Sequence, residues 1–133
     1  MSNLILEIPR EDLEKIISRA KQSEQEIIGV FLGRKTQRKR KVEVTEFLTN
    51  VTQSRVRFEV DPEEFYTVIE RAEAEELDLI GFFHSHPAPP RPSDIDLTYM
   101  KFWPNSYWLI IDGNTGNYTA WQYEKTSVQV IPV

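Results

Sequence analysis

The two histidines of this chain, His84 and His86, stand one residue apart at the end of an apolar run, residues 79–83. A short apolar run followed by proline-rich sequence is typical of a buried strand that ends there. Side chains at positions i and i+2 point to the same face of a strand, so both imidazoles should project together as the strand leaves the core. We therefore expect a buried strand that ends in two like-facing imidazoles.

A carboxylate follows this strand at a short distance along the chain. Asp96 comes after a proline-rich hook, three residues past Ser93. Two histidines and a carboxylate make three protein ligands, which suits a zinc site with one position left open for water. The chain has no cysteine, so histidine and carboxylate would have to hold any transition metal. The alternative is that the histidines are structural residues of the strand end.

Asp96 also fits a second role. Ser93-x-x-Asp96 resembles a capping box at a helix start, with Asp in place of the usual Glu or Gln. The two roles are compatible, because a helix start fixed by Ser93 would hold Asp96 facing the histidine strand. Asp94 is the rival ligand, but it lies on a different face of this helix, and we expect it at the surface or behind the ligands.

Length and composition favour an ordinary globular chain. We expect a single domain over residues 1–133, with 40% hydrophobic and 28% charged residues. The first ten residues lack the pattern of a signal peptide, and no stretch approaches the ~18 apolar residues of a membrane helix. We therefore expect a cytoplasmic protein without a membrane partner.

Charge is unevenly distributed although the net charge is only −5. Six basic residues and no acidic one lie within residues 34–41. We expect this basic segment to be a solvated connection between strands. The alternative is a docking site for an acidic partner; nucleic acid is not expected, because one basic loop without interleaved aromatic residues is not a recognised binding module.

Hydrophobic periodicity predicts alternating strands and helices. Pro9 fits a helix start, Asp61 a helix cap before Pro62, and Pro104 a helix end. The fold class expected is α/β: one domain with a mixed, mainly antiparallel sheet and three helices packed around it. Strands are expected over 4–8, 26–33, 41–51, 56–60, 79–86, 107–111, 118–123 and 128–131, and helices over 9–23, 62–72 and 94–102.

Glu26 is the one charged residue of the otherwise apolar stretch 26–33. Spacing alone favours the interpretation that it marks the solvent end of a strand buried on both faces. A functional carboxylate at this place is the other interpretation.

The residues taken together resemble a known family. His84-Ser85-His86-Pro87, a short proline-rich loop and Ser93-x-x-Asp96 resemble the motif of the JAMM (MPN-plus) zinc metalloproteases. Glu26, upstream in an apolar strand, is similar in place to the catalytic glutamate of that family. The resemblance covers nearly the whole chain and points to the compact archaeal or bacterial type, similar to desampylases, with a JAMM/MPN-like domain in a cytidine-deaminase-like α-β-α arrangement.

The resemblance implies roles for individual residues. His84, His86 and Asp96 would hold one zinc ion per chain, with water as a fourth ligand. Glu26 would act as general base and then general acid, and Ser93 would donate to the oxyanion. The substrate implied is the bond after the C-terminal glycines of a ubiquitin-like modifier. A sheet edge at 51–60, including Val56 and Phe58, is the substrate-binding stretch we expect.

Other functions stay open at this point. One is a zinc peptidase that processes a sulfur-carrier protein, and another is a non-catalytic MPN scaffold, although the chain keeps every residue of the motif. A nucleobase deaminase is disfavoured, because its P-C-x-x-C ligands need cysteine. We expect a monomer or a homodimer.

Overall fold

The computed structural model describes residues 3–52, 59–124 and 126–133. Within these ranges the chain folds into seven strands and three helices. Their order is β1 (Ile5–Ile8), α1 (Arg10–Gln22), β2 (Ile28–Lys35), β3 (Lys39–Leu48), α2 (Pro62–Ala74), β4 (Asp78–His86), α3 (Asp94–Met100), β5 (Tyr107–Asp112), β6 (Tyr118–Gln122) and β7 (Thr126–Pro132).

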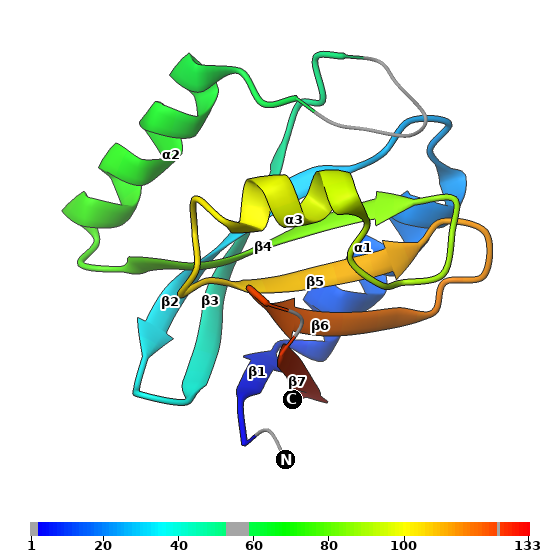
Figure 1. Ribbon diagram of the computed structural model, residues 1–133. Helices are drawn as coiled ribbons and strands as arrows, with labels where there is room; N and C mark the ends of the chain where they lie inside the picture. Colours follow the sequence, from blue (N-terminus) through cyan, green and yellow to red (C-terminus); the bar gives the residue numbers. More distant parts are fainter. Residues whose placement is uncertain (1–2, 53–58, 125) are drawn as a thin grey trace.

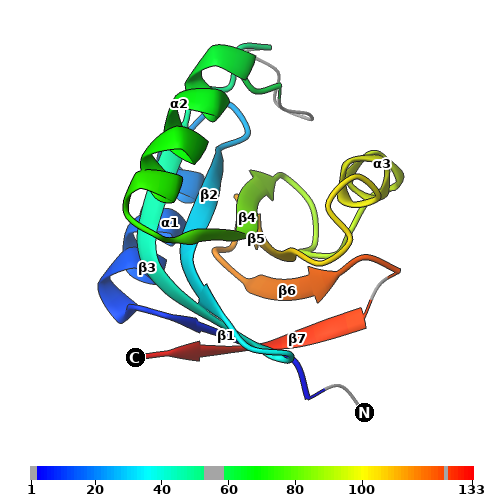
Figure 2. The ribbon, with the colours of Figure 1, turned by 90° about the vertical axis from the view of Figure 1, so that its left-hand side faces the viewer.

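The strands close into a barrel in the order β1-β3-β2-β4-β5-β6-β7 (Figures 1 and 2). β1 completes the ring by pairing in parallel with both β3 and β7. β4 and β5 are also parallel, and the four other pairs are antiparallel. The predicted mixed, mainly antiparallel sheet in an α-β-α arrangement is therefore wrong, because the sheet closes on itself as a barrel. Alternation such as Leu4-Leu6-Ile8 reports which face of a strand is buried, but not whether both of its edges are paired.

Two hydrophobic cores hold the barrel and its helices together. All seven strands contribute to the first core, which therefore lies within the barrel and extends to α1. The second core lies between β2, β4 and β5 and the two helices α2 and α3. Neighbouring residues of one strand divide between the cores: Phe83 belongs to the first, and Phe82 belongs to the second. β4 is thus buried on both faces before it reaches the histidines.

Gly29 shows how tightly the first core is packed. It pairs with Phe83 across β2 and β4. A Cβ atom at Gly29 would lie 2.0 Å from the Phe83 ring, so no larger residue fits without moving that ring.

The helix predictions agree closely with the structure. Asp61 caps α2 by accepting from the Glu63 N–H at 2.9 Å, and Pro62 occupies the first turn. α3 begins after Ser93 as expected and ends two residues earlier than predicted, at Met100. No described helix has the length and hydropathy that a transmembrane span requires.

The basic segment agrees with its prediction only in part. Residues 34–38 and Lys41 are exposed as expected, but β2 continues to Lys35 and β3 already begins at Lys39. Arg40 is buried, and its guanidinium lies 4.4 Å from the centre of the Tyr107 ring. The sequence of a basic segment does not show which of its side chains is buried, and here it is Arg40.

Candidate metal centre

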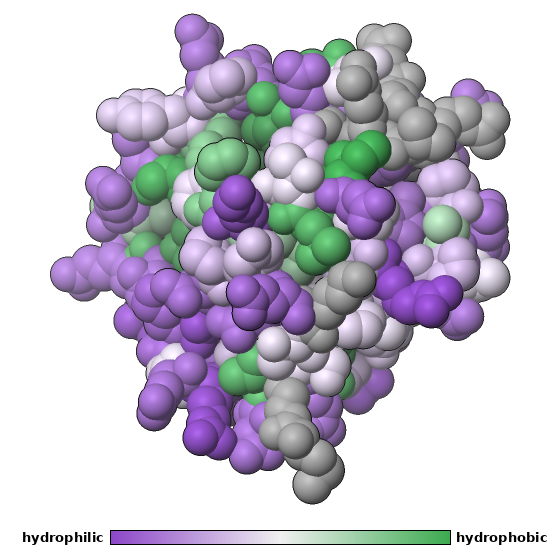
Figure 3. Space-filling model, viewed as in Figure 1, coloured by the Kyte–Doolittle hydropathy of each residue, from purple (hydrophilic) through white to green (hydrophobic). Residues whose placement is uncertain are grey.

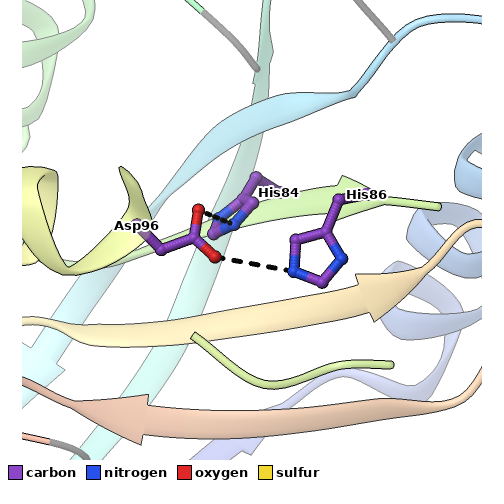
Figure 4. Close-up of side chains that lie close together, drawn as sticks. All are labelled: His84, His86 and Asp96. Carbon is purple, nitrogen blue, oxygen red and sulfur yellow. Dashed lines mark ion pairs between the residues drawn. The ribbon is translucent and has the colours of Figure 1, made fainter. Parts of the chain in front are cut away.

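β4 carries both histidines to the outer side of the barrel, where α3 lies (Figure 4). His84 is paired across the sheet with Ile28 of β2 and with Ile110 of β5, so its backbone is held from both sides. Both imidazoles are buried, and their ring centres lie 5.7 Å apart. The two-residue period of the strand accounts for their common direction, as predicted.

α3 brings the carboxylate to them. Ser93 and Asp96 form the predicted capping box: the Ser93 hydroxyl accepts from the Asp96 N–H at 3.1 Å, and Asp96 Oδ2 accepts from the Ser93 N–H at 2.9 Å. Asp96 is 3% exposed, whereas Asp94 is exposed to solvent. The helix start therefore selects Asp96 and turns Asp94 outward.

The spacing of the three side chains fits a zinc ion. Asp96 Oδ1 lies 2.9 Å from His84 Nε2, and Asp96 Oδ2 lies 3.5 Å from His86 Nε2 (Figure 4). One ligand atom from each residue lies within 4.8 Å of the other two. Tetrahedral zinc with bonds of about 2.0–2.1 Å needs neighbouring ligand atoms about 3.3 Å apart. The donor set and the spacing therefore suit zinc.

The buried charges shift one another's protonation. Burial alone would raise the pKa of Asp96, but hydrogen bonds from His84 and His86 hold that pKa far below its usual range. Burial alone would lower the pKa of His86, but the hydrogen bond and the charge of Asp96 raise it. The carboxylate thus stays ionised beside the imidazoles, which is the form that binds a cation.

Glu26 lies beside this cluster and not at a solvent end. It is 4% exposed, so the interpretation that spacing favoured is wrong. Burial, and then the charge of Asp96, raises the pKa of Glu26 to about 8, although His86 lowers it in part. A carboxyl group with a pKa this close to neutral can both accept and release a proton under physiological conditions.

A cavity of about 570 Å³ opens next to the cluster. Its lining includes His86, Ser93 and Asp96 together with Trp121 of β6 and most of the proline-rich hook, residues 87–92. Trp121 Nε1 donates to the Pro90 carbonyl at 3.2 Å, and the Thr119 hydroxyl donates to the same oxygen. The hook is thereby fastened to β6. Nothing in the sequence singled out Trp121 for this role.

A second hollow lies where residues of β2, β4 and β5 meet residues of α2 and α3. It has a volume of about 340 Å³ and is lined by apolar and aromatic side chains, including Ile28, Phe65, Trp103 and Trp108. Trp108 also faces the His84 ring at 6.0 Å. Figure 3 shows hydrophobic side chains near the centre of this face, with hydrophilic ones between them. The predicted substrate-binding residues Val56 and Phe58, with most of the edge 51–60, lie outside the described residues.

A comparison with known protein families shows to which family this chain belongs. The model of the prokaryotic homologues of the JAB domain, Prok-JAB, matches residues 9–124. The chain belongs to the Prok-JAB family. The match spans β2, β4 and α3, and therefore all of Glu26, His84, His86 and Asp96.

Relatives of this Prok-JAB protein include two curated desampylases. A desampylase of Pyrococcus furiosus is 41% identical over 115 residues, which cover 86% of this chain and 78% of the relative. A desampylase of Haloferax volcanii is 35% identical over 100 residues, covering 74% of this chain and 69% of the relative. The predicted family is thus confirmed.

Solved structures share the fold of this Prok-JAB protein. A solution structure of a protein from Desulfitobacterium hafniense superimposes with a TM-score of 0.78 at 25% identity, covering 96% of this chain and 94% of that chain. The crystal structure of a JAB1/MPN domain protein from Archaeoglobus fulgidus gives a TM-score of 0.58 at 22% identity, covering 96% and 98%.

Proposed function

We propose that this protein is a zinc-dependent, desampylase-like isopeptidase that hydrolyses the bond after the C-terminal glycines of a ubiquitin-like modifier. The observation that carries the proposal is the convergence of His84, His86 and Asp96 beside a buried Glu26, in a chain 41% identical to a desampylase. The partners proposed are small ubiquitin-like modifiers and their conjugates. The cytoplasmic location, the single domain and the oligomeric state stay predictions.

His84, His86 and Asp96 would hold the metal through the atoms that already face one another. Zinc supplies two effects when bound: it lowers the pKa of a water ligand to about 7, and it polarises the carbonyl under attack. The protein contributes a buried, preformed site with its negative charge on Asp96. The helix cap at Ser93 keeps that carboxylate in place.

Glu26 carries the proton. As a carboxylate it accepts a proton from the attacking water, and as an acid it passes that proton to the leaving amine. Its raised pKa, about 8, keeps the two forms close in free energy near neutral pH.

Ser93 is the proposed donor to the oxyanion. Its oxygen accepts from the Asp96 N–H, and a hydroxyl can donate its own proton while it accepts. Ser93 lines the cavity together with His86 and Asp96, so the hydroxyl lies at the wall where the carbonyl would be bound. Loss of one such donor typically lowers turnover by ~10²–10³.

The decisive experiment compares Glu26→Gln with the wild type. The substrate is a diglycine-ended ubiquitin-like modifier linked to a lysine peptide, with and without a chelator. Glu26→Gln should keep about one zinc per chain and lose about 10³-fold or more in turnover, since it removes the proton carrier and no ligand. Cleavage at the wild-type rate, or cleavage that resists the chelator, would rule out the mechanism.

A further inference from the structure

The peptide group between Glu26 and Ile27 is held on both sides by side chains from distant parts of the chain. Its carbonyl oxygen accepts from Asn50 Nδ2 at 2.9 Å. Its N–H donates to the Ser85 hydroxyl at 3.0 Å. Glu26 precedes β2, which begins at Ile28, so this peptide lies outside the regular hydrogen bonding of the strand. The side chains of Asn50 and Ser85 therefore make the hydrogen bonds that a neighbouring strand would otherwise make to this peptide.

The orientation of the Asn50 amide is fixed by its other contacts. Asn50 is buried, and its Oδ1 accepts from the main-chain N–H groups of Thr52 at 3.2 Å and Glu59 at 3.1 Å. Main-chain N–H groups can only donate, so the atom that they address must be the oxygen. The amide nitrogen then faces the Glu26 carbonyl, where it is needed.

Ser85 connects this peptide to the metal ligands. It lies between His84 and His86 on β4, and its side chain points away from theirs, to the Ile27 N–H. The hydroxyl is buried and reaches across to a residue 58 positions earlier. The backbone next to Glu26 is therefore hydrogen-bonded directly to β4, the strand that carries both imidazoles.

The carboxyl group of Glu26 depends on this backbone support. Among the described residues, no hydrogen-bond donor contacts Glu26 Oε2. This oxygen is not held by a donor of its own among those residues, so the place of the carboxyl group depends on where the backbone of Glu26 is held. A displacement of about 1 Å in a reacting group can cost ~10² in rate.

We propose that Asn50 and Ser85 are positioning residues that clamp the Glu26–Ile27 peptide and so aim the Glu26 carboxyl at the metal centre. The proposal rests on the proposed function, in which Glu26 carries the proton. Neither residue contacts the metal or the substrate in this role. Their loss should therefore lower kcat without lowering zinc content or raising KM.

The test measures kcat, KM and zinc content for Asn50→Ala and Ser85→Ala with the diglycine-modifier isopeptide. Each variant should lose about 10- to 100-fold in kcat, with KM within about twofold and zinc retained. Ser85→Thr keeps the hydroxyl and should stay near the wild type. Because both side chains hold one peptide, the double variant should lose clearly less than the product of the single losses.

Two further variants separate this effect from general destabilisation. Thr45→Val removes another partly buried hydrogen bond, from Thr45 to Asp12, on β3 and should leave kcat unchanged. Asn50→Asp keeps the acceptor for Thr52 and Glu59 but removes the donor to Glu26, so it tests the clamp even where Asn50→Ala fails to fold.

The Glu26→Gln background distinguishes the two proposals. Native-rate cleavage by Glu26→Gln itself would overturn the proposed function. If Glu26→Gln is impaired as expected, Asn50→Ala should lower its residual rate no further. An equal additional loss in that background, or a kcat for Asn50→Ala and Asn50→Asp within twofold of Thr45→Val, would overturn the clamp alone.

Discussion

Buried charged residues lie at both ends of β2, but the groups that surround them differ. At the Lys35 end, Arg40 lies over the Tyr107 ring and donates to the carbonyls of Thr36 at 2.8 Å and Asn105 at 3.0 Å. At the Ile28 end, Glu26, His84, His86 and Asp96 surround one another. At the first end a single cation, Arg40, is surrounded by neutral groups. At the second end four titratable groups lie close together.

The difference is between a charge that is held in one state and a cluster of groups whose protonation can change. Carbonyl oxygens and an aromatic ring stabilise a cation but neither gain nor lose protons near neutral pH, so the Arg40 end has a single state. At the other end the pKa values of Glu26 and His86 are raised and that of Asp96 is lowered, and Asp96 presents its charge where a cation would neutralise it. We expect substitutions to affect stability at the first end and chemistry at the second.

The largest effect is expected for Asp96→Asn. The amide oxygen can still accept from the Ser93 N–H and so preserve the helix cap, but the negative ligand is lost. We expect weak or no zinc binding and a loss of about 10³-fold or more in cleavage. Metal analysis and turnover check this. Asp94→Asn, in the same helical turn but exposed, is the matched control and should change neither. Tight zinc binding by Asp96→Asn would point to other ligands.

Arg40→Met should have the reverse profile. It leaves the carbonyls of Thr36 and Asn105 without their buried donor, at a cost of about 2–3 kcal/mol in the free energy of unfolding. Activity per folded molecule and zinc content should stay at the wild-type level. Denaturant unfolding measures the loss, with the exposed Arg38→Met as control. A selective loss of turnover in Arg40→Met would break the comparison between the two ends.

Metal-free protein should lose stability as the pH rises from about 5 to 8. The pKa of Glu26 is raised from 4.5 to about 8, so in this interval the unfolded chain releases a proton that the folded chain keeps. The raised pKa of His86 acts in the same direction above 6.5, whereas the lowered pKa of Asp96 costs stability only when the pH falls below 3.8.

Zinc should reverse this slope, because the ligands bind metal in their deprotonated forms. Thermal unfolding of metal-free and zinc-loaded protein at both pH values provides the measurement. Metal-free Glu26→Gln should show a flatter pH dependence than the metal-free wild type. A metal-free wild type that is more stable at pH 8 than at pH 5 would contradict the assigned pKa shifts.

The smallest effect is expected for Trp121→Phe. It removes the Nε1 donor, which contacts the Thr119 hydroxyl at 2.7 Å and the Pro90 carbonyl at 3.2 Å, and a neutral hydrogen bond of this kind is worth about 1 kcal/mol. Because this bond helps to fasten the hook that lines the cavity, KM should rise a few-fold while zinc content is unchanged. Tyr118→Phe, on the opposite face of β6, serves as control. A loss of zinc in Trp121→Phe would show that the hook also supports the ligands.

The sequence by itself determined the local parts of the site. The strand period placed His84 and His86 on one face, and the Ser93 cap selected Asp96 over Asp94, because each depends only on residues a few positions apart. The resemblance carried by these motifs led to the family. Helix starts at Pro62 and Asp94 were equally local and equally predictable.

Only the tertiary structure decided what depends on distant pairings. The closure of the barrel by β1, the burial of Glu26 and of Arg40, and the contacts from Asn50 and Ser85 to one peptide all join residues far apart in the chain. Periodicity records which face of an element is apolar, but the partner that covers that face is chosen by packing of the whole chain. For that reason the cluster of His84, His86 and Asp96 could be predicted from the sequence, whereas the hydrogen bonds from Asn50 and Ser85 to the Glu26–Ile27 peptide could not.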